Sequence, residues 1–297
     1  MKSKKALVLT AFTTLLLSSC FDSTTKNDLT QAVPVFKASI TRASGANWDK
    51  GDKIGISKLS DGKIQSDNYQ YTLAEDNIFV PAKASLEYSR DESACDFTAY
   101  YPYSELTKEG SYKVDLTDQS DLTKIDLLYS DNAKNKKIGD KEVALNFIHK
   151  LSLFNLIVNN ESGKDYEISL TTQTNGTFNL LQDRFILDET TKPVTGFDNT
   201  SALLMPGSET TVQISCNGKT ASRKVRKELL QSGKRCKLTI NIREGEDTTI
   251  SFGSATIQKW TGGKNYDITL EVGEETVDSD FYASPAVVEE ISSEPQL

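Results

Sequence analysis

Apolar and polar residues alternate with a period of two along much of the chain. Phe36, Ala38 and Ile40 alternate with polar residues, and the same spacing returns in three later stretches, residues 212–216, 238–242 and 266–272. Successive side chains of a β-strand point to opposite faces, so each stretch predicts a strand with one buried face and one solvated face. The pattern predicts an all-β protein.

Turn residues separate the alternating stretches. Asp61-Gly62, Asn175-Gly176 and Asn217-Gly218 lie between such stretches, and these pairs favour the tight turns that join antiparallel strands. Strands and turns at this spacing predict antiparallel β-sandwiches. One short helix is predicted over residues 223–231, because Gly233 fits the position just past a helix end.

The length of the β-rich region predicts two domains. About 260 residues of β-structure exceed one typical sandwich domain. We therefore predict two tandem antiparallel β-sandwich domains, residues 35–144 and 145–275. The polar stretch 130–142 divides them, with clustered charges that suit a solvated connection, although a long hairpin loop would have the same composition.

The N-terminus has the order of an export signal. Three lysines precede an apolar run, residues 6–17, which is too short to span ~30 Å of hydrocarbon as a helix. The small residues that follow, ending at Cys20, look like a bacterial lipobox. We predict a lipoprotein signal peptide over residues 1–20, with Cys20 lipidated, and a polar tether over residues 21–34. An ordinary signal peptide with a chance cysteine is the alternative.

Charge and composition exclude several functions. The chain has 34 Lys and Arg against 42 Asp and Glu, a formal net charge of −8, which does not suit a protein that binds nucleic acid. With one histidine, a catalytic scheme that needs two is impossible. Four cysteines without a C-x-x-C pair argue against structural zinc, and we expect no metal and no other cofactor.

Candidate catalytic residues are sparse. His149 lies three positions before Ser152, so in a strand the two would face opposite sides, and no G-x-S-x-G motif is present. A histidine satisfied by backbone or solvent is the preferred interpretation, and we predict that the protein is not an enzyme. The aromatic residues of segment 97–103, with Trp48 and Trp260, leave a second hypothesis open: an outer-surface lipoprotein that binds glycan by stacking.

Two further features have more than one interpretation. Cys216 and Cys236 lie in neighbouring predicted strands, and they could form a disulfide or remain as buried thiols. The segment 219–237 is rich in Lys and Arg, and it could contact an acidic neighbour or lipopolysaccharide, or form a solvated face.

Seven short motifs follow one another between residues 36 and 260. They are FKASITRA (36–43), WDKGDKIGI (48–56), FTAYYPY (97–103), DLLY (126–129), FIHKLS (147–152), LLMP (203–206) and IQKW (257–260). In this order, behind a lipobox-like segment, they resemble the fimbrillin family, the subunits of Bacteroidales-type (type V) pili. The resemblance implies two β-sandwich domains of transthyretin-like or immunoglobulin-like topology.

The resemblance also implies a function and a location. The chain would be a structural or accessory subunit of an extracellular pilus, as stalk, tip or anchor, and would contribute to adhesion. Its partners would be other pilus subunits, the outer membrane through the lipid anchor, and a glycan or protein on a host or bacterial surface. Its location would be the outer membrane and the extracellular fimbrium.

The family's assembly scheme can be carried onto particular residues. An Arg-specific protease removes the first strand, and a neighbour's donor strand takes its place. On this chain the cut would fall between Arg42 and Ala43, and Phe36, Ala38 and Ile40 would belong to the strand that leaves. An exposed Arg42 that no protease touches is the alternative.

The acidic C-terminal tail, residues 276–297, is the candidate source of a donor strand. It has no Lys or Arg, yet it contains Phe281, Val287, Val288 and Ile291. Pro285 interrupts the segment, and a proline cannot donate to a strand ladder except at an edge or a bulge.

Overall fold

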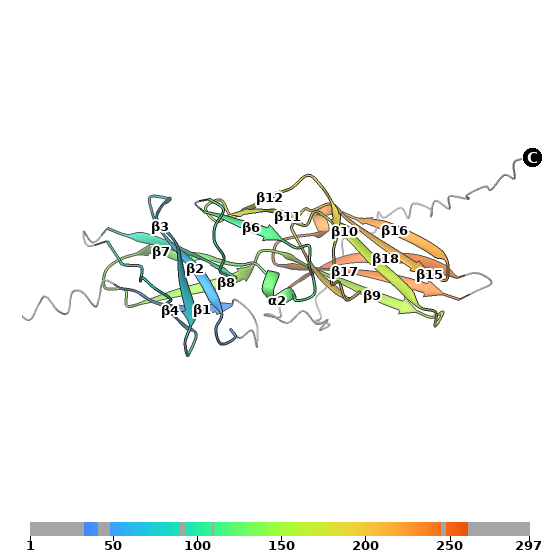
Figure 1. Cartoon of the computed structure of the whole chain (residues 1–297), viewed down its shortest axis with the longest axis horizontal. Helices are drawn as coiled ribbons and strands as arrows, with labels where there is room; N and C mark the ends of the chain where they lie inside the picture. The colour runs from blue at the N-terminus through green and yellow to red at the C-terminus, as the bar shows by residue number, and fades with distance from the viewer. Residues whose placement is uncertain (1–32, 41–47, 90–92, 109, 245–247, 261–297) are drawn as a thin grey trace, which may run out of the picture.

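The computed structural model describes residues 33–40, 48–89, 93–108, 110–244 and 248–260. Over these ranges the protein consists almost entirely of β-strands, so the all-β prediction is confirmed (Figure 1). The molecule is elongated, and its buried apolar residues form three clusters.

Seven strands close into a barrel at one end of the molecule (Figure 1, left). Their order around the barrel is β1-β4-β3-β2-β5-β7-β8. The strands are Val35–Ile40 (β1), Lys53–Ser60 (β2), Lys63–Leu73 (β3), Ile78–Pro81 (β4), Cys95–Tyr101 (β5), Leu128–Lys136 (β7) and Glu142–His149 (β8). A sandwich was predicted for this part of the chain. The strands form a barrel instead, because β1 bridges the edges of β4 and β8.

A small sheet and a short helix occupy the middle of the molecule. The sheet has the order β12-β11-β6, with strands Ser111–Asp115 (β6), Asn175–Asn179 (β11) and Arg184–Leu187 (β12). The helix is Leu122–Ile125 (α2), and the side chain of Asp121 accepts a hydrogen bond from Thr123 N at its start, as N-cap residues do.

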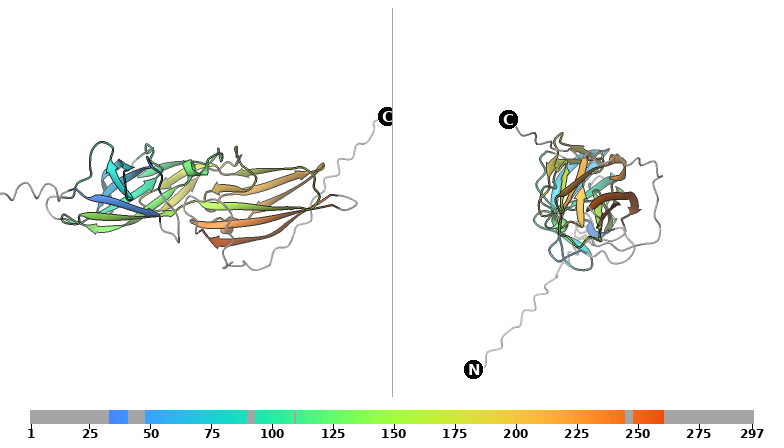
Figure 2. Two further views of the ribbon diagram at one scale, coloured as in Figure 1. Left: turned by 90° about the horizontal axis from the view of Figure 1, so that it is seen from below. Right: turned by 90° about the vertical axis from the view of Figure 1, so that its right-hand side faces the viewer.

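Two four-stranded sheets form the other end. One has the order β13-β10-β15-β16, with strands Tyr166–Thr172 (β10), Lys192–Pro193 (β13), Thr210–Cys216 (β15) and Lys219–Val225 (β16). The other has the order β14-β9-β17-β18, with strands Ser152–Asn160 (β9), Ser201–Leu204 (β14), Lys234–Arg243 (β17) and Thr249–Lys259 (β18). Both sheets contribute to one apolar cluster. Viewed along the long axis, the barrel and these sheets lie one behind the other (Figure 2).

The strands do not separate at the predicted domain boundary. The boundary after residue 144 falls inside β8, and the polar stretch 130–142 runs through β7 into β8, which pair with each other. Strand β6, from the first predicted domain, pairs with β11 from the second. The division into domains at 35–144 and 145–275 therefore stays a prediction.

The predicted helix over residues 223–231 is wrong. Arg223 and Val225 belong to β16, and only Lys227–Leu229 (η1) forms a single 3-10 turn. The backbone is extended because β16 pairs with β15 along its length and Arg223 Nη1 donates a hydrogen bond to Gly253 O at 2.8 Å.

Two of the predicted tight turns are confirmed and one is not. Asp61-Gly62 and Asn217-Gly218 join β2 to β3 and β15 to β16, with positive φ at both residues of each pair, as two-residue hairpins require. Asn175-Gly176 instead opens β11. At Gly176 a Cβ atom would lie 2.5 Å from Ile186 O, so the glycine permits close approach of the neighbouring strand.

Candidate functional site

Strand β1 fills the gap between two strands that are distant in the sequence. It pairs in parallel with β8 over six positions and antiparallel with β4 over two. Val35 N donates to Lys141 O at 3.0 Å, and Ala38 N donates to Asn77 O at 2.9 Å. The first described strand of the chain thus closes the barrel.

The inward side chains of β1 belong to the barrel core. Phe36, Ala38 and Ile40 are 0%, 1% and 6% exposed, whereas the residues between them are exposed. The ring of Phe36 meets Tyr71 and Phe97 edge-on, each at 5.1 Å between ring centroids, a favourable aromatic geometry. The buried face predicted from the alternation is confirmed.

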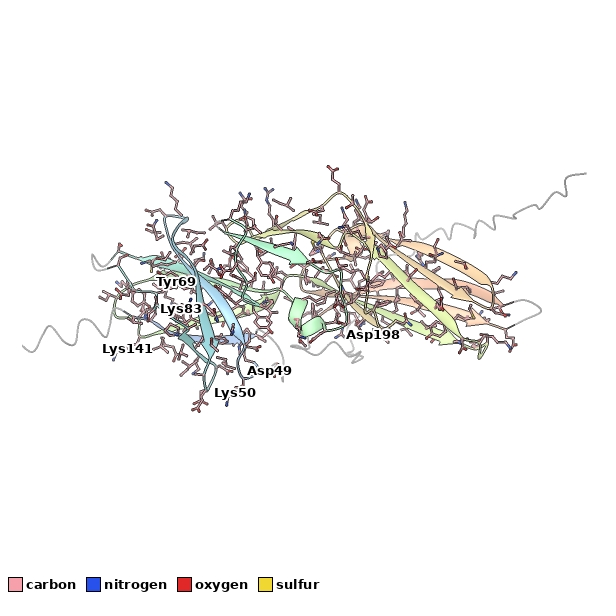
Figure 3. The ribbon with its side chains drawn as sticks, viewed as in Figure 1. Asp49, Lys50, Tyr69, Lys83, Lys141 and Asp198 are labelled. Atoms are coloured by element: carbon pink, nitrogen blue, oxygen red, sulfur yellow. The ribbon has the colours of Figure 1, made fainter. Side chains whose placement is uncertain are left out.

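Trp48 connects β1 to the barrel wall. Its Nε1 donates a hydrogen bond to Ala38 O at 3.1 Å. Its ring contacts three aromatic rings edge-on at centroid distances of 5.1 to 5.5 Å, those of Phe79, Tyr101 and Phe147. The residues that follow it, Asp49 and Lys50, lie toward the middle of the molecule (Figure 3). Lys141, which accepts from the start of β1, lies at the far end of the barrel (Figure 3).

Seven predicted site residues lie outside the described ranges. They are Cys20, Arg42, Ala43, Phe281, Val287, Val288 and Ile291. Lipidation, cleavage and strand donation at these positions stay predictions.

The single histidine is buried against a carboxylate and an indole. His149 Nδ1 lies 2.7 Å from Asp126 Oδ2, and the two side chains are 0% and 1% exposed. The imidazole stacks on Trp260 with 3.6 Å between ring centroids and 18° between the planes. The expectation of a histidine satisfied by backbone or solvent is wrong, because its partners are side chains from two other segments. Since all three side chains are buried, a substrate has no access to the imidazole.

Lys150, the next residue, is also buried. Its Nζ lies 2.5 Å from Asp183 Oδ1 and 5.7 Å from the ring centroids of Tyr129 and Phe178. Ion pairing and two aromatic faces therefore stabilise a charge that is only 7% exposed. Neither His149 nor Lys150 was predicted as part of a cluster, because their partners are distant in the sequence.

The aromatic residues proposed as stacking platforms for glycan belong to the core. Trp48 and Trp260 are 8% and 1% exposed, and Phe97, Tyr100 and Tyr101 are all buried. Within segment 97–103 only Tyr103 has a ring that is half-buried, and its hydroxyl donates to Glu105. In the described conformation, Tyr103 is therefore the one aromatic residue of these segments with a ring that a sugar could partly reach.

The described part of the chain contains neither a cluster of metal-binding side chains nor a disulfide. Over these ranges no group of three or more His, Cys, Asp or Glu side chains could hold a metal ion. Cys95, Cys216 and Cys236 are free and buried, so Cys216 and Cys236 are thiols rather than a disulfide. Burial raises the pKa of the Cys236 thiol to about 12.

No helix in the described ranges is both long enough and apolar enough to cross a bilayer.

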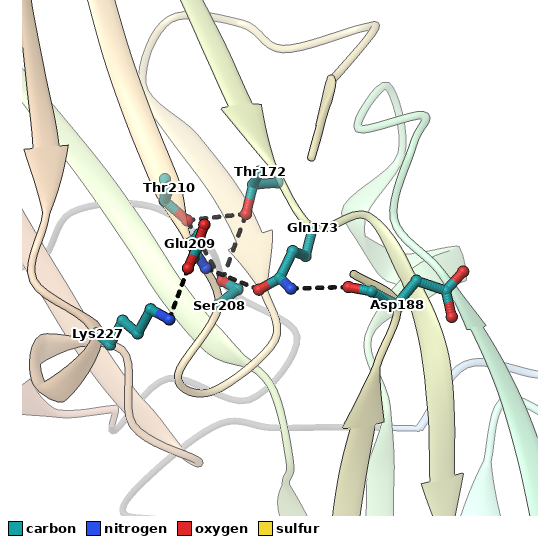
Figure 4. Close-up of polar contacts among 7 residues, drawn as sticks. All are labelled: Thr172, Gln173, Asp188, Ser208, Glu209, Thr210 and Lys227. Carbon is teal, nitrogen blue, oxygen red and sulfur yellow. Dashed lines mark hydrogen bonds and ion pairs between the residues drawn. The ribbon is translucent and has the colours of Figure 1, made fainter. Parts of the chain in front are cut away.

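Polar side chains join the middle sheet to the sheet that contains β10 and β15 (Figure 4). Gln173 Nε2 donates to Asp188 O at 2.7 Å, and Gln173 Oε1 accepts from Glu209 N at 2.9 Å. Beside them, the buried hydroxyls of Thr172 and Thr210 bond to each other at 2.8 Å.

The basic segment 219–237 has partners within the chain. Lys227 Nζ lies 2.8 Å from Glu209 Oε1 (Figure 4), and Arg223 donates to the backbone of β18. Arg235 is 5% exposed. Part of the basic excess therefore serves contacts between strands rather than a free cationic surface.

The sequence of this chain matches a known protein family. The model of the family described as fimbrillin-like matches residues 41–260. The chain belongs to the fimbrillin-like family. A relative from Bacteroides uniformis named "Putative fimbrium subunit Fim1C" is 31% identical over 213 residues, which cover 64% of this chain and 70% of the relative.

The fold of this fimbrillin-like chain is also found in solved structures. A crystal structure described as a "putative cell adhesion protein" from Bacteroides uniformis has a TM-score of 0.63 at 24% identity, covering 77% of this chain and 99% of that one. A second, from Bacteroides ovatus, has a TM-score of 0.57 at 19% identity, covering 77% and 97%. Both likenesses concern the fold.

The seven motifs gather in two places in the fimbrillin-like fold. Residues of the first three motifs line the barrel core. Residues of the last four meet in the middle of the molecule, where Leu127, Leu151, Leu203 and Trp260 share one apolar cluster. The motifs are therefore packing segments of the fold, and those at 126–129, 147–152 and 257–260 supply the Asp126–His149–Trp260 contact.

Proposed function

We propose that this fimbrillin-like protein is a structural subunit of an extracellular fimbria, joined to its neighbours by strand exchange at the barrel. In this scheme the chain is cut between Arg42 and Ala43, β1 leaves, and a donor strand of another subunit takes its place. The family description and the name of the 31% identical relative support the fimbrial assignment.

The observation that carries the proposal is the position of β1. It is a short strand near the N-terminus whose inward side chains are buried, yet its strand neighbours β4 and β8 are held by other parts of the barrel. Removing β1 would leave those two strands with free edges. In this proposal an incoming strand takes the place of β1, while the pairings of β3 with β4 and of β7 with β8 stay as they are.

The energetics of such an exchange favour an occupied slot. Loss of Phe36 and Ile40 would expose apolar surface worth roughly 1.5–3 kcal/mol for each side chain. It would also leave backbone donors and acceptors of β4 and β8 without their strand partner. A donor strand restores both contributions, which is the general basis of binding by strand addition.

Export and anchoring belong to the same proposal. Lipidation at Cys20 would hold the precursor at the outer membrane before the cut, because the acyl chains and β1 are on the same side of Arg42. Cleavage would then release the subunit from its lipid and open the slot in one step. A subunit that escapes cleavage would remain as a membrane anchor, and adhesion would follow from the polymer.

The test is N-terminal sequencing of the protein in membrane and fimbrial fractions. We expect a lipidated Cys20 start in the membrane fraction and an Ala43 start in heat-resistant multimers. Arg42→Lys should abolish multimers by removing the site for an Arg-specific protease, while Arg184→Lys, an exposed change on β12, should not. Multimers that retain residues 36–40, or that form normally in Arg42→Lys, would contradict the proposal.

A further inference from the structure

The sheet that contains β9 and β17 has one face turned away from the apolar core between the two four-stranded sheets. The core face is marked by Ala202, Phe154, Cys236 and Ile257, which are register partners across the four strands and belong to that core. Side chains alternate along a strand, so the residues before and after these four point to the opposite side. We call that side the outer face.

A row of polar side chains crosses the outer face. The polar row consists of Ser201, Asn155, Lys237 and Thr256, which are register partners on β14, β9, β17 and β18. Asn155 is 0% exposed and Ser201 is 6% exposed, although neither faces the sandwich core. Polar side chains on a solvated sheet face are mostly exposed, so this burial indicates that a further segment packs on the outer face.

Two oxygen atoms of the polar row have no hydrogen-bond donor within the described ranges. Asn155 Nδ2 donates to Ser201 Oγ at 2.7 Å, but Asn155 Oδ1 accepts no hydrogen bond there. The same holds for Thr256 Oγ1, and both atoms are buried. A buried acceptor without a donor costs free energy, and the N–H groups of an extended segment are suitable donors. The polar row therefore has the chemistry of a backbone-binding surface.

The chain that follows Trp260 begins at this face. Trp260 comes directly after β18, four positions after Thr256, and belongs to the same apolar cluster as Leu153, which is also on the outer face. Gly262 and Gly263 come next, and glycines allow the chain to reverse direction tightly. The residues after this pair can therefore return across the outer face.

Charge complementarity favours the same segment. Arg235 and Lys237 of β17 both belong to the outer face, one row apart. Residues 261–297 contain nine Asp and Glu against one Lys. Asp267 is the first of the nine, seven positions after Trp260. Seven residues of extended chain span up to about 23 Å, which is enough to turn at the glycines and reach these two cations.

We propose that residues 261–269 of the same chain lie across the polar row as a strap. Asp267 then places its carboxylate beside Arg235 and Lys237, and the strap excludes water from Asn155. This contact fixes the base of the acidic tail on its own subunit and leaves residues 276–297 outside it. The strap goes beyond the fimbrial function proposed above and does not depend on strand exchange.

The location of the strap is tested by carbodiimide coupling of the full chain, as an equal mixture of unlabelled and ¹⁵N-labelled protein. The reagent joins a carboxylate to a lysine amine as an amide, and the carbodiimide takes up the water that is lost. Mass spectrometry of the digest identifies each coupled pair of peptides. We expect a Lys237–Asp267 amide in which both peptides carry the same isotope, because the strap and the polar row belong to one chain.

The ion pair is tested by proteolysis of two tail variants. Lys264 is the one lysine after Trp260, so the endoproteinase Lys-C, which cuts after lysine, reports access to the strap. We expect Asp267→Asn to speed cutting at Lys264 at least fivefold, because it removes the carboxylate that holds the strap. Asp278→Asn, the same change outside the strap, should leave the rate unchanged.

Three results would overturn the proposal. Coupling of Asp267 mainly to Lys259, with none to Lys237, would place the segment at the end of β18 instead of across the face. Lys237–Asp267 products with mixed isotopes would show that a second copy covers the polar row. Equal rates of cutting at Lys264 in the Asp267→Asn and Asp278→Asn proteins would show that the carboxylate holds nothing. Because both substitutions lie in the tail, the described strands keep their own residues in every protein compared.

Discussion

The imidazole of His149 lies flat on the indole of Trp260, with 3.6 Å between ring centroids. His149 ends β8 of the barrel, and Trp260 follows β18, the last described strand. The contact therefore joins the barrel to the far sheet directly, and Asp126, beside the imidazole, ties the same point to α2. These three side chains make the junction a single buried unit.

Breaking this unit should be costly. We expect His149→Leu to lower the free energy of unfolding by about 3–5 kcal/mol, because the change leaves the buried Asp126 carboxylate without its imidazole partner. The double variant Asp126→Leu/His149→Leu should lose clearly less than the two single losses added together. Urea unfolding of all four proteins measures the coupling, and strictly additive losses would show that the two side chains do not interact.

The burial of β1 can be tested in the uncut protein. Phe36→Asp/Ile40→Asp places two carboxylates in the barrel core, and we expect a loss of several kcal/mol or failure to fold. The matched control Lys37→Asp/Ser39→Asp puts the same groups on the exposed face and should change stability by about 1 kcal/mol or less. Thermal melts of the two variants compare them, and equal melting temperatures would mean that β1 does not contribute to the core.

Alkaline pH should unfold the protein. Burial raises the pKa of Tyr71, Tyr100, Tyr112 and Tyr129 above the ordinary value of 10.0. The folded state therefore disfavours tyrosinate, so this contribution is intact below about pH 9 and is lost as the pH rises past the unfolded-state value. Urea unfolding at a series of pH values should show falling stability from there upward. Tyrosinate absorbance that rose for all tyrosines near pH 10 while the fold persisted would contradict this.

The buried thiols should be inert in the native state. Cys95, Cys216 and Cys236 are all buried, which keeps a reagent from their sulfur atoms. Burial also raises the pKa of Cys236 to about 12, so that this thiol is hardly ionised at neutral pH. We expect these three residues to react with a thiol reagent at least a hundredfold faster in urea than in buffer. Peptide mapping of the labelled protein identifies each site, and rapid native labelling at Cys236 would disprove its burial.

The parts of the fold that depend on neighbouring residues could be predicted from the sequence. The alternation at Phe36, Ala38 and Ile40 gave the buried face of β1, and Asp61-Gly62 gave a hairpin. Closure of the barrel could not be predicted in this way. The parallel partner of β1, β8, is about a hundred residues away, and no turn signal accompanies such a pair.

The candidate site was predictable to the same extent. The inward residues of β1 followed from periodicity, whereas the hydrogen bond from Trp48 to Ala38 depends on a contact across the barrel. Likewise, Asp126, His149 and Trp260 stand in three separate motifs, and nothing in their spacing shows that they meet. The helix predicted over residues 223–231 failed because pairing with β15 outweighs local propensity.

The parallel pairing of β1 with β8 has a mechanical consequence. β8 runs along the elongated molecule and passes through Lys150 and Leu151 directly into β9 (Figure 1). Tension applied along that direction to whatever strand fills the slot would strain all six paired positions in shear at once, rather than peel them apart singly. Load would then pass through the covalent backbone from one end of the molecule to the other.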